Sequence, residues 1–207
     1  MKYLLFVGIV FFSLFASAQE TNPNKYGMDT TSTLPIGLQV NTLAPNIKTT
    51  SITGDAINTD KLLQQGPVVV IFYRGEWCPV CNRYLSTLNN SLPEIKAKGA
   101  TVLVISPEQQ SSASKTAENT QSDFIFISDT NLEICRNFDV LFDVTQKYQE
   151  RILKNLDTDI AQNNGKDTAQ LPVPATFIID TDGKIIYKQF DYNYTNRATA
   201  EDILKML

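Results

Sequence analysis

Two cysteines, Cys78 and Cys81, stand three residues apart, and this spacing is typical of a pair that cycles between dithiol and disulfide. Residues 68–71 before them are a short run of apolar, β-branched side chains, which predicts a buried strand. Residues 82–98 after them carry apolar side chains at helical spacing. The pair is therefore expected where a strand ends and a helix begins.

This position has consequences for the chemistry of the cysteines. Free backbone N–H groups and the positive end of the helix dipole stabilise a thiolate, so Cys78 is expected to have the lower pKa and to act as the nucleophile. Cys81, about one helical turn further on, would attack the resulting mixed disulfide. Pro79 suits the first turn, because its missing N–H has no partner there. We expect Cys78 to lie exposed at the mouth of the helix and Cys81 to lie deeper.

Residues 72–82, which read FYRGEWCPVCN, resemble the peroxiredoxin-like branch of the thioredoxin superfamily, the alkyl hydroperoxide reductase/thiol-specific antioxidant (redoxin) group. The similarity extends from about Leu38 to the C-terminus and includes residues 171–177 and 191–195. It implies an α/β, thioredoxin-like fold with a central mixed sheet flanked by helices and an N-terminal extension. It also implies a thiol–disulfide oxidoreductase that uses no metal or organic cofactor.

The resemblance assigns roles to residues around the cysteines. Pro174 matches the cis-proline that lies beside the dithiol in thioredoxin-like folds, where the backbone of its neighbour, here Val173, binds a substrate peptide as an added strand. Trp77 would shield the sulfurs and offer a platform to a partner, with plain core packing as the alternative. Arg74 is a candidate for lowering the pKa of Cys78, with a surface ion pair as the alternative.

Other functions fit the same cysteines. Peroxiredoxins carry Pro-x-x-x-Thr/Ser-x-x-Cys, and in that register Arg74 stands at the proline, Cys78 at the hydroxyl residue and Cys81 at the peroxidatic cysteine. The first alternative is therefore an antioxidant thiol peroxidase. The second is a redox-inert binding domain with a structural 78–81 disulfide. Phe72 occupies the position of the buried acid of thioredoxins, so the proton acceptor for the second thiol stays unassigned.

Composition narrows the class of partner. The 207 residues suit one domain, residues 38–207, behind a leader. With 18 basic and 22 acidic residues, the net charge of −4 argues against nucleic acid or an anionic membrane as partner. The chain has no histidine, which excludes histidine-dependent triads and disfavours a zinc site. The expected partner is a thiol/disulfide redox protein or a hydroperoxide.

The N-terminus has the pattern of an export signal. Residues 1–18 hold one lysine, an apolar run and a final Ala-Ser-Ala, which matches a signal peptide cleaved before Gln19. The run is shorter than a membrane-spanning helix requires, which disfavours the alternative of a retained anchor. Residues 19–37, rich in Thr, Asn and Pro, are expected to form a flexible linker. We expect an exported protein, periplasmic or extracellular, without stable membrane insertion after cleavage.

The rest of the chain alternates strands and helices, as in a sheet with parallel crossovers. Cys135 is expected to be a small buried side chain, and Pro93 to kink or break the helix that follows the cysteines. The expected strands are 47–52, 56–59, 101–106, 124–128, 175–179 and 184–190, and the expected helices are 60–63 capped by Asp60, part of 107–123, 132–139, 144–156 and one opening at Thr199, with 157–170 as a polar loop.

Overall fold

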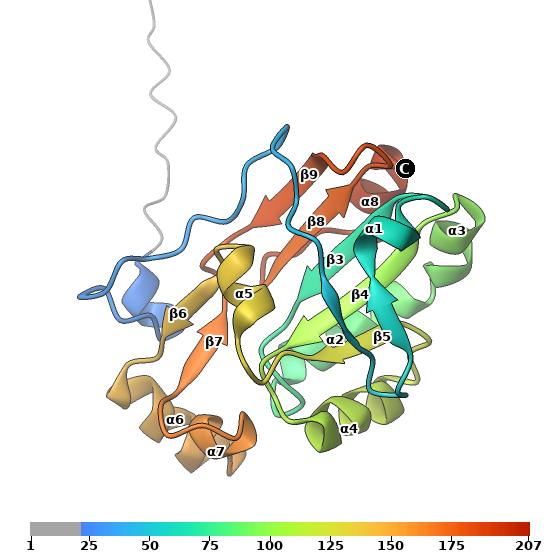
Figure 1. Cartoon of the computed structure of the whole chain (residues 1–207). Coiled ribbons are helices and arrows are strands. Elements are labelled where there is room, and N and C mark those ends of the chain that lie inside the picture. The colour runs from blue at the N-terminus through green and yellow to red at the C-terminus, as the bar shows by residue number, and fades with distance from the viewer. Residues whose placement is uncertain (1–21) are drawn as a thin grey trace, which may run out of the picture.

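A mixed five-stranded sheet forms the centre of the protein in a computed structural model that describes residues 22–207 (Figure 1). The expected signal peptide, residues 1–18, lies outside the described residues. Neighbouring strands follow the order β5-β4-β3-β8-β9, with β3, β4 and β5 parallel and β8 and β9 antiparallel to their neighbours. The strands are β3 (Val68–Phe72), β4 (Thr101–Ser106), β5 (Ile125–Ser128), β8 (Ala175–Ile179) and β9 (Ile185–Phe190). The expected α/β architecture with a central mixed sheet is confirmed.

Helices cover both faces of the sheet, because the central strands are apolar on both sides. In β3, Val69 and Ile71 belong to one buried cluster, whereas Val68 and Val70 belong to the other. The first cluster packs under α2 (Pro79–Asn89), α3 (Leu92–Ala97), α4 (Gln110–Thr120) and α8 (Ala200–Met206), and the second under α5 (Glu133–Asn137), α1 (Thr59–Leu62) and the hairpin of β1 (Lys48–Thr50) and β2 (Ala56–Asn58).

Two helix boundaries depend on local chemistry. The expected helix 82–98 is broken between α2 and α3, with Pro93 in the first turn of α3, as predicted. The expected cap at Asp60 is wrong, because the side chain of Asn58 accepts the N–H of Asp60 at 3.0 Å and so caps α1 at an earlier residue.

A small second sheet was not predicted. β6 (Leu141–Asp143) pairs with β7 (Gln170–Pro172), and between them lie α6 (Gln146–Leu156) and α7 (Ile160–Asn163), the latter inside the expected polar loop. Strands of three residues are too short to show an alternating pattern in the sequence. This pairing holds α6 beside the start of α2.

Residues 22–37, expected as part of a flexible linker, pack against the domain. They contain a short 3₁₀ helix, Pro23–Tyr26, and the buried side chain of Met28. The backbone N–H of Asp29 donates to the carbonyl of Asp143 at 2.9 Å, and that of Gly37 donates to Asp139 at 2.8 Å. This segment thereby brings the 3₁₀ helix next to α6.

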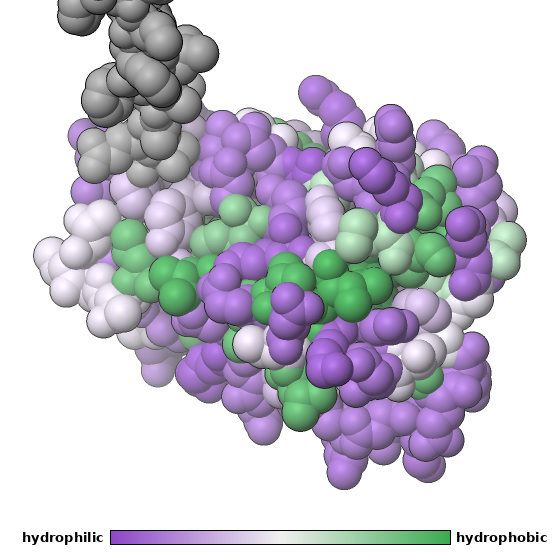
Figure 2. All heavy atoms as spheres, turned by 90° about the horizontal axis from the view of Figure 1, so that it is seen from above, coloured by the Kyte–Doolittle hydropathy of each residue, from purple (hydrophilic) through white to green (hydrophobic). Residues whose placement is uncertain are grey.

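The surface carries an apolar band on the face seen from above (Figure 2). Three of the exposed large apolar side chains, Ile36, Val40 and Leu43, belong to the segment that precedes β1. Within residues 22–207, no helix is both long enough and apolar enough to cross a membrane.

Candidate active site

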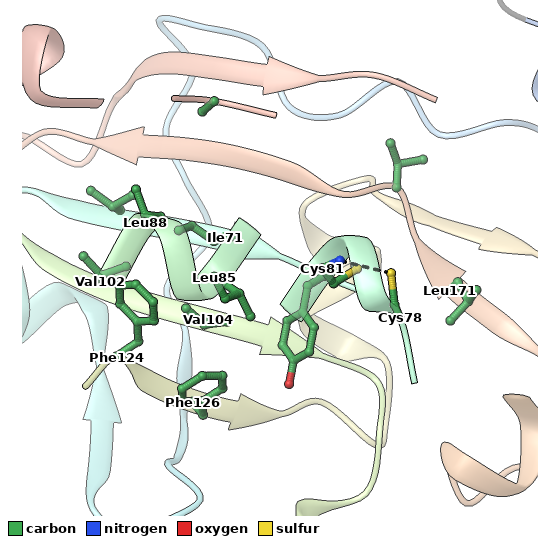
Figure 3. Packing of buried hydrophobic residues seen from close by; sticks show 14 of the residues in the cluster. Ile71, Cys78, Cys81, Leu85, Leu88, Val102, Val104, Phe124, Phe126 and Leu171 are labelled. Atoms are coloured by element: carbon green, nitrogen blue, oxygen red, sulfur yellow. Dashed lines mark hydrogen bonds between the residues drawn. The ribbon is translucent and has the colours of Figure 1, made fainter. Parts of the chain in front are cut away.

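Cys78 and Cys81 lie where β3 passes into α2, as the sequence predicts. Cys78 is the N-cap residue of α2, and Pro79 is the first residue of the helix. The Sγ atom of Cys78 accepts the backbone N–H of Cys81 at 3.3 Å, so the helix N-terminus is capped by a sulfur (Figure 3). Both residues are free thiols in this structure.

Both cysteines are fully buried, which contradicts the expectation that Cys78 is exposed. They belong to one apolar cluster with side chains from the second sheet and from α6, among them Leu171 and Tyr148. In Figure 3, Leu171 lies on the far side of Cys78 from Cys81. The insertion between β6 and β7 therefore covers the mouth of the helix.

Arg74 contacts Cys78 directly. Its Nη2 donates to the Sγ of Cys78 at 3.1 Å, and its Nη1 donates to the hydroxyl of Tyr148. The guanidinium stacks on the ring of Tyr194, 3.6 Å from its centroid, and lies 5.1 Å from that of Trp77. Burial disfavours its charge, but the two sulfurs outweigh burial and raise the pKa of Arg74 above its usual value. The alternative role of Arg74 in a surface ion pair is thereby excluded, because its side chain is only 4% exposed.

Arg197 supplies a second guanidinium, to which sequence reasoning assigned no role. Its Nη2 donates to the Sγ of Cys81 at 3.4 Å, and its Nε donates to the carbonyl of Tyr194 at 2.6 Å. Arg197 stands just before α8, whose N-cap Thr199 forms a capping box with Asp202. Each sulfur of the pair thus faces its own cation.

The two thiols ionise in the opposite order from the prediction. Burial raises the pKa of Cys78 well above its usual range, and the neighbouring Cys81 adds to this effect. Burial alone would also raise the pKa of Cys81, but the hydrogen bond from Cys78 and the charges of Arg197 and Arg74 lower it well below its usual range. These surroundings favour loss of the first proton of the pair from Cys81.

Glu108 is a buried carboxylate that the sequence analysis missed. It follows the end of β4, and its Oε2 accepts the backbone N–H of Glu76 at 2.7 Å. Its Oε1 accepts the hydroxyls of Tyr73 at 2.5 Å and Ser106 at 3.0 Å. Glu108 thus fixes the loop between β3 and Cys78, a role that becomes visible only when β4 pairs with β3.

Glu108 gives a testable dependence of stability on pH. Burial raises its pKa, so the native state holds this proton more tightly than the unfolded chain. The stability that this adds is fully present below the unfolded pKa, about 4.3, and is lost as the pH rises through the folded pKa. Glu108→Gln cannot ionise, so it should remove this loss of stability with rising pH. Urea titrations from pH 4 to 8 should therefore show an unfolding free energy that changes less with pH in the variant than in the unchanged protein. Identical slopes in both proteins would contradict this.

Gly75 allows the loop to pass close to Trp77. Its φ is +149°, and a Cβ there would lie 2.6 Å from Nε1 of Trp77. Trp77 is itself buried in the cluster that holds the cysteines, so it packs in the core.

Gly75→Ala should slow disulfide turnover by about tenfold or more, because a displacement near 1 Å in an active site costs up to 10²-fold. Gly54→Ala is the matched control, since Gly54 also has a positive φ but an added Cβ there meets nothing within 4 Å. Both variants should lose some stability to backbone strain. Equal turnover in the two variants would show that the fit of Gly75 to Trp77 is unimportant.

The predicted cis bond before Pro174 is wrong, because the described residues contain no cis peptide bond. The N–H of Val173 donates to the carbonyl of Val140 at 2.7 Å, which keeps the chain extended between β7 and β8. The trans form is also the intrinsically favoured one. This N–H is therefore engaged within the protein and does not face a substrate strand, although Val173 packs in the same cluster as the cysteines.

Cys135 lies apart from this site. It is fully buried, and burial followed by the charge of Asp129 raises its pKa well above the usual range. It belongs to the cluster on the other face of the sheet from Cys78 and Cys81. Residues 22–207 contain no group of His, Cys, Asp and Glu side chains that could hold a metal ion.

Comparison with known proteins gives consistent matches. The model of the AhpC/TSA family matches residues 40–188. A thiol-disulfide oxidoreductase ResA of Bacillus cereus is 23% identical over 151 residues, which are 73% of this chain and 69% of that protein. Peroxiredoxin Bcp of Escherichia coli (strain K12) is 26% identical over 160 residues, which are 77% of this chain and 90% of that protein.

Solved structures share the fold. Peroxidoxin BcpB from Mycobacterium tuberculosis aligns with a TM-score of 0.62 and 20% identity, over 82% of this chain and 96% of its own. Enterococcus faecalis AhpC aligns with a TM-score of 0.59 and 15% identity, over 80% of this chain and 88% of its own. The thioredoxin-like fold expected from the sequence is confirmed.

Proposed function

The chain belongs to the AhpC/TSA family, and we propose that it is a thiol–disulfide oxidoreductase that cycles Cys78 and Cys81 between a dithiol and a disulfide. An oxidoreductase activity is shared by its relatives, and the finer proposal concerns the cysteine pair. The observation that carries it is the contact between Cys81 N–H and the Sγ of Cys78 at the start of α2, with one guanidinium on each sulfur.

The geometry supports a two-step exchange. Cys78, the N-cap residue of α2, attacks a sulfur of the partner disulfide and passes its proton to the Cys81 thiolate. A Cys78–partner disulfide forms, and the first partner sulfur leaves as a thiolate that takes this proton back. The Cys81 thiolate then attacks the sulfur of Cys78, which releases the second partner thiolate and leaves the Cys78–Cys81 disulfide. Arg74 and Arg197 stabilise the Cys81 thiolate before it attacks, and the negative charge then leaves with the second partner thiolate.

A second function is favoured by the order of ionisation. Cys81 has the lower pKa and stands at the peroxidatic position of the peroxiredoxin register. In a thiol peroxidase, the Cys81 thiolate attacks a peroxide oxygen and becomes a sulfenic acid, while the other oxygen leaves as an alcohol or water. The Cys78 thiol then displaces water and forms the same disulfide. The two functions share the pair and differ in the oxidant and in the cysteine that attacks it.

One assay separates these two functions. With dithiothreitol as the common reductant, the rate of insulin reduction is compared with the rate of hydroperoxide consumption, using the protein that lacks both cysteines as the blank. The proposed function predicts that insulin reduction exceeds the blank and that peroxide consumption does not. The reverse result would transfer the proposal to the peroxidase.

The midpoint potential tests whether the pair is redox-active at all. Arg74 and Arg197 stabilise the reduced, ionised pair, which makes the disulfide easier to reduce. We expect a potential above about −300 mV, the limit below which structural disulfides of secreted proteins are found. A value well below this limit would instead support the redox-inert binding domain.

We also propose that the protein is exported, to the periplasm or beyond, on the strength of the signal-like residues 1–18. N-terminal sequencing of the protein purified from cells of its source should give Gln19 as the first residue. Membrane-bound material that begins at Met1 would instead support a retained anchor. Export would place the pair in a compartment where disulfides form.

A further inference from the structure

A groove adjoins the redox pair. It has a volume of about 340 Å³ and lies between the N-terminal 3₁₀ helix, the first turn of α2 and helix α6. Its lining includes Arg74, which is buried, and Lys25 and Arg151, which are exposed, together with Pro79 and Val80 from the first turn of α2. Because the guanidinium of Arg74 also donates to the Sγ of Cys78, the groove ends one side chain away from a reactive sulfur.

The groove is cationic in an acidic protein. Its lining contains Lys25, Arg74 and Arg151 but no Asp or Glu. An adjoining hollow of about 730 Å³ also borders Lys25 and Arg151, and it adds Lys147 and Lys154 against the single carboxylate of Glu150. The net charge of the chain is −4, so the positive charge of this surface is opposite in sign to that of the whole protein.

Lys25 and Arg151, unlike Arg74, have no acidic partner among residues 22–207. In the part of the chain that the structure describes, the only ion pair joins Lys184 and Asp182, away from the groove. Lys25 and Arg151 rest instead on aromatic rings, 5.5 Å from the centroid of Tyr26 and 4.4 Å from that of Tyr148. A carboxylate placed in the groove would therefore gain cationic partners without breaking an ion pair.

The cations also have a linear arrangement. Lys147, Arg151 and Lys154 follow one another at helical spacing along one side of α6. Seven residues of helix span about 10 Å, which is longer than a single carboxylate group and matches several acidic residues in an extended peptide. Val80 and Ile152 add apolar area between the charges.

We propose that this groove binds an acidic segment next to the cysteine of the protein that exchanges disulfides with Cys78 and Cys81. The proposal rests on the proposed dithiol–disulfide cycle and names the class of partner. In the reductive direction, the partner thiolate attacks the Cys78 sulfur of the Cys78–Cys81 disulfide, and Cys81 leaves as a thiolate. A second partner thiolate then attacks the mixed disulfide, so that the partner is oxidised and Cys78 is reduced.

The test uses the oxidised full-length mature protein and three cysteine peptides that differ only in the residues beside the cysteine: four Asp, four Asn or four Lys. Reduction of the 78–81 disulfide is followed by quenched alkylation and mass measurement. At low salt, the Asp peptide should react at least tenfold faster than the Asn peptide, and the Lys peptide more slowly than either. The difference should shrink as salt rises, because the Debye length falls to about 8 Å at 0.15 M ionic strength.

Variants assign the effect to the groove. Lys25→Gln with Arg151→Gln should bring the ratio of Asp to Asn rates towards one, whereas Lys61→Gln, on α1, should keep the ratio of the unchanged protein. Equal rates with the Asp and Asn peptides would overturn the docking proposal but not the proposed function. An unchanged ratio of Asp to Asn rates in the double variant would do the same. If no peptide, and no dithiothreitol, reduces the disulfide, the proposed function fails together with the docking.

Discussion

Cys78→Ser and Cys81→Ser should each reduce turnover to the level of the variant that lacks both Cys78 and Cys81. Cys135→Ser should retain the turnover of the unchanged protein. Each change removes one of the two sulfurs that must form the disulfide, and no other cysteine shares their buried cluster. Cys135 lies in the cluster across the sheet, so its replacement is expected to cost stability rather than activity. The measurements are insulin reduction for turnover and urea unfolding for stability.

The same variants test the order of ionisation. Thiolate absorbance near 240 nm, followed against pH, should show a low pKa in Cys78→Ser, where Cys81 keeps Arg197 and Arg74 nearby. In Cys81→Ser the remaining thiol should titrate higher, because burial dominates at Cys78. The opposite order would restore the assignment drawn from helix geometry alone. A bridge from Cys135 to either site cysteine, found by peptide mapping, would require a different mechanism.

Arg197→Ala is expected to raise the pKa of Cys81, because it removes a positive charge that lowers this pKa. The reactive form is the thiolate, so the rate of insulin reduction at pH 7 should fall. The pH profile of that rate should move to higher pH by as much as the pKa of Cys81 rises. The rate should fall by less than tenfold for each unit by which the pKa rises, because a more basic thiolate is also the better nucleophile. Arg197→Lys keeps the charge and should restore most of the rate.

Arg74→Ala is expected to have a larger effect than Arg197→Ala. Arg74 donates to Cys78, lowers the pKa of Cys81 by its charge and fills the space between Tyr148 and Tyr194. Arg74→Met keeps most of this volume without the charge, so it separates packing from electrostatics. Pre-steady-state rates across pH 5 to 9 provide the measurement. An unchanged pH profile in both Arg74→Met and Arg197→Ala would show that neither cation tunes the pair.

The sequence alone determined the features that depend on neighbours in the chain. The apolar β-branched run predicted β3, and the helical spacing after it predicted α2, because side-chain periodicity reports which face of an element is buried. Cys78 at the N-cap and Pro79 in the first turn follow from the same local chemistry. The resemblance of residues 72–82 then led to the correct family and fold.

Tertiary structure alone decided what surrounds the sulfurs. Arg197 reaches Cys81 across 116 positions of the chain, and Glu108 reaches the loop at Glu76 across 32. Sequence spacing carries no information about such contacts, which exist only once α8 has packed against α3 and β4 has paired with β3. The pKa of a thiol depends on its burial and on the distances to charges, both of which are set by this packing. For that reason the sequence identified the pair, whereas the fold determined which of its two sulfurs ionises first.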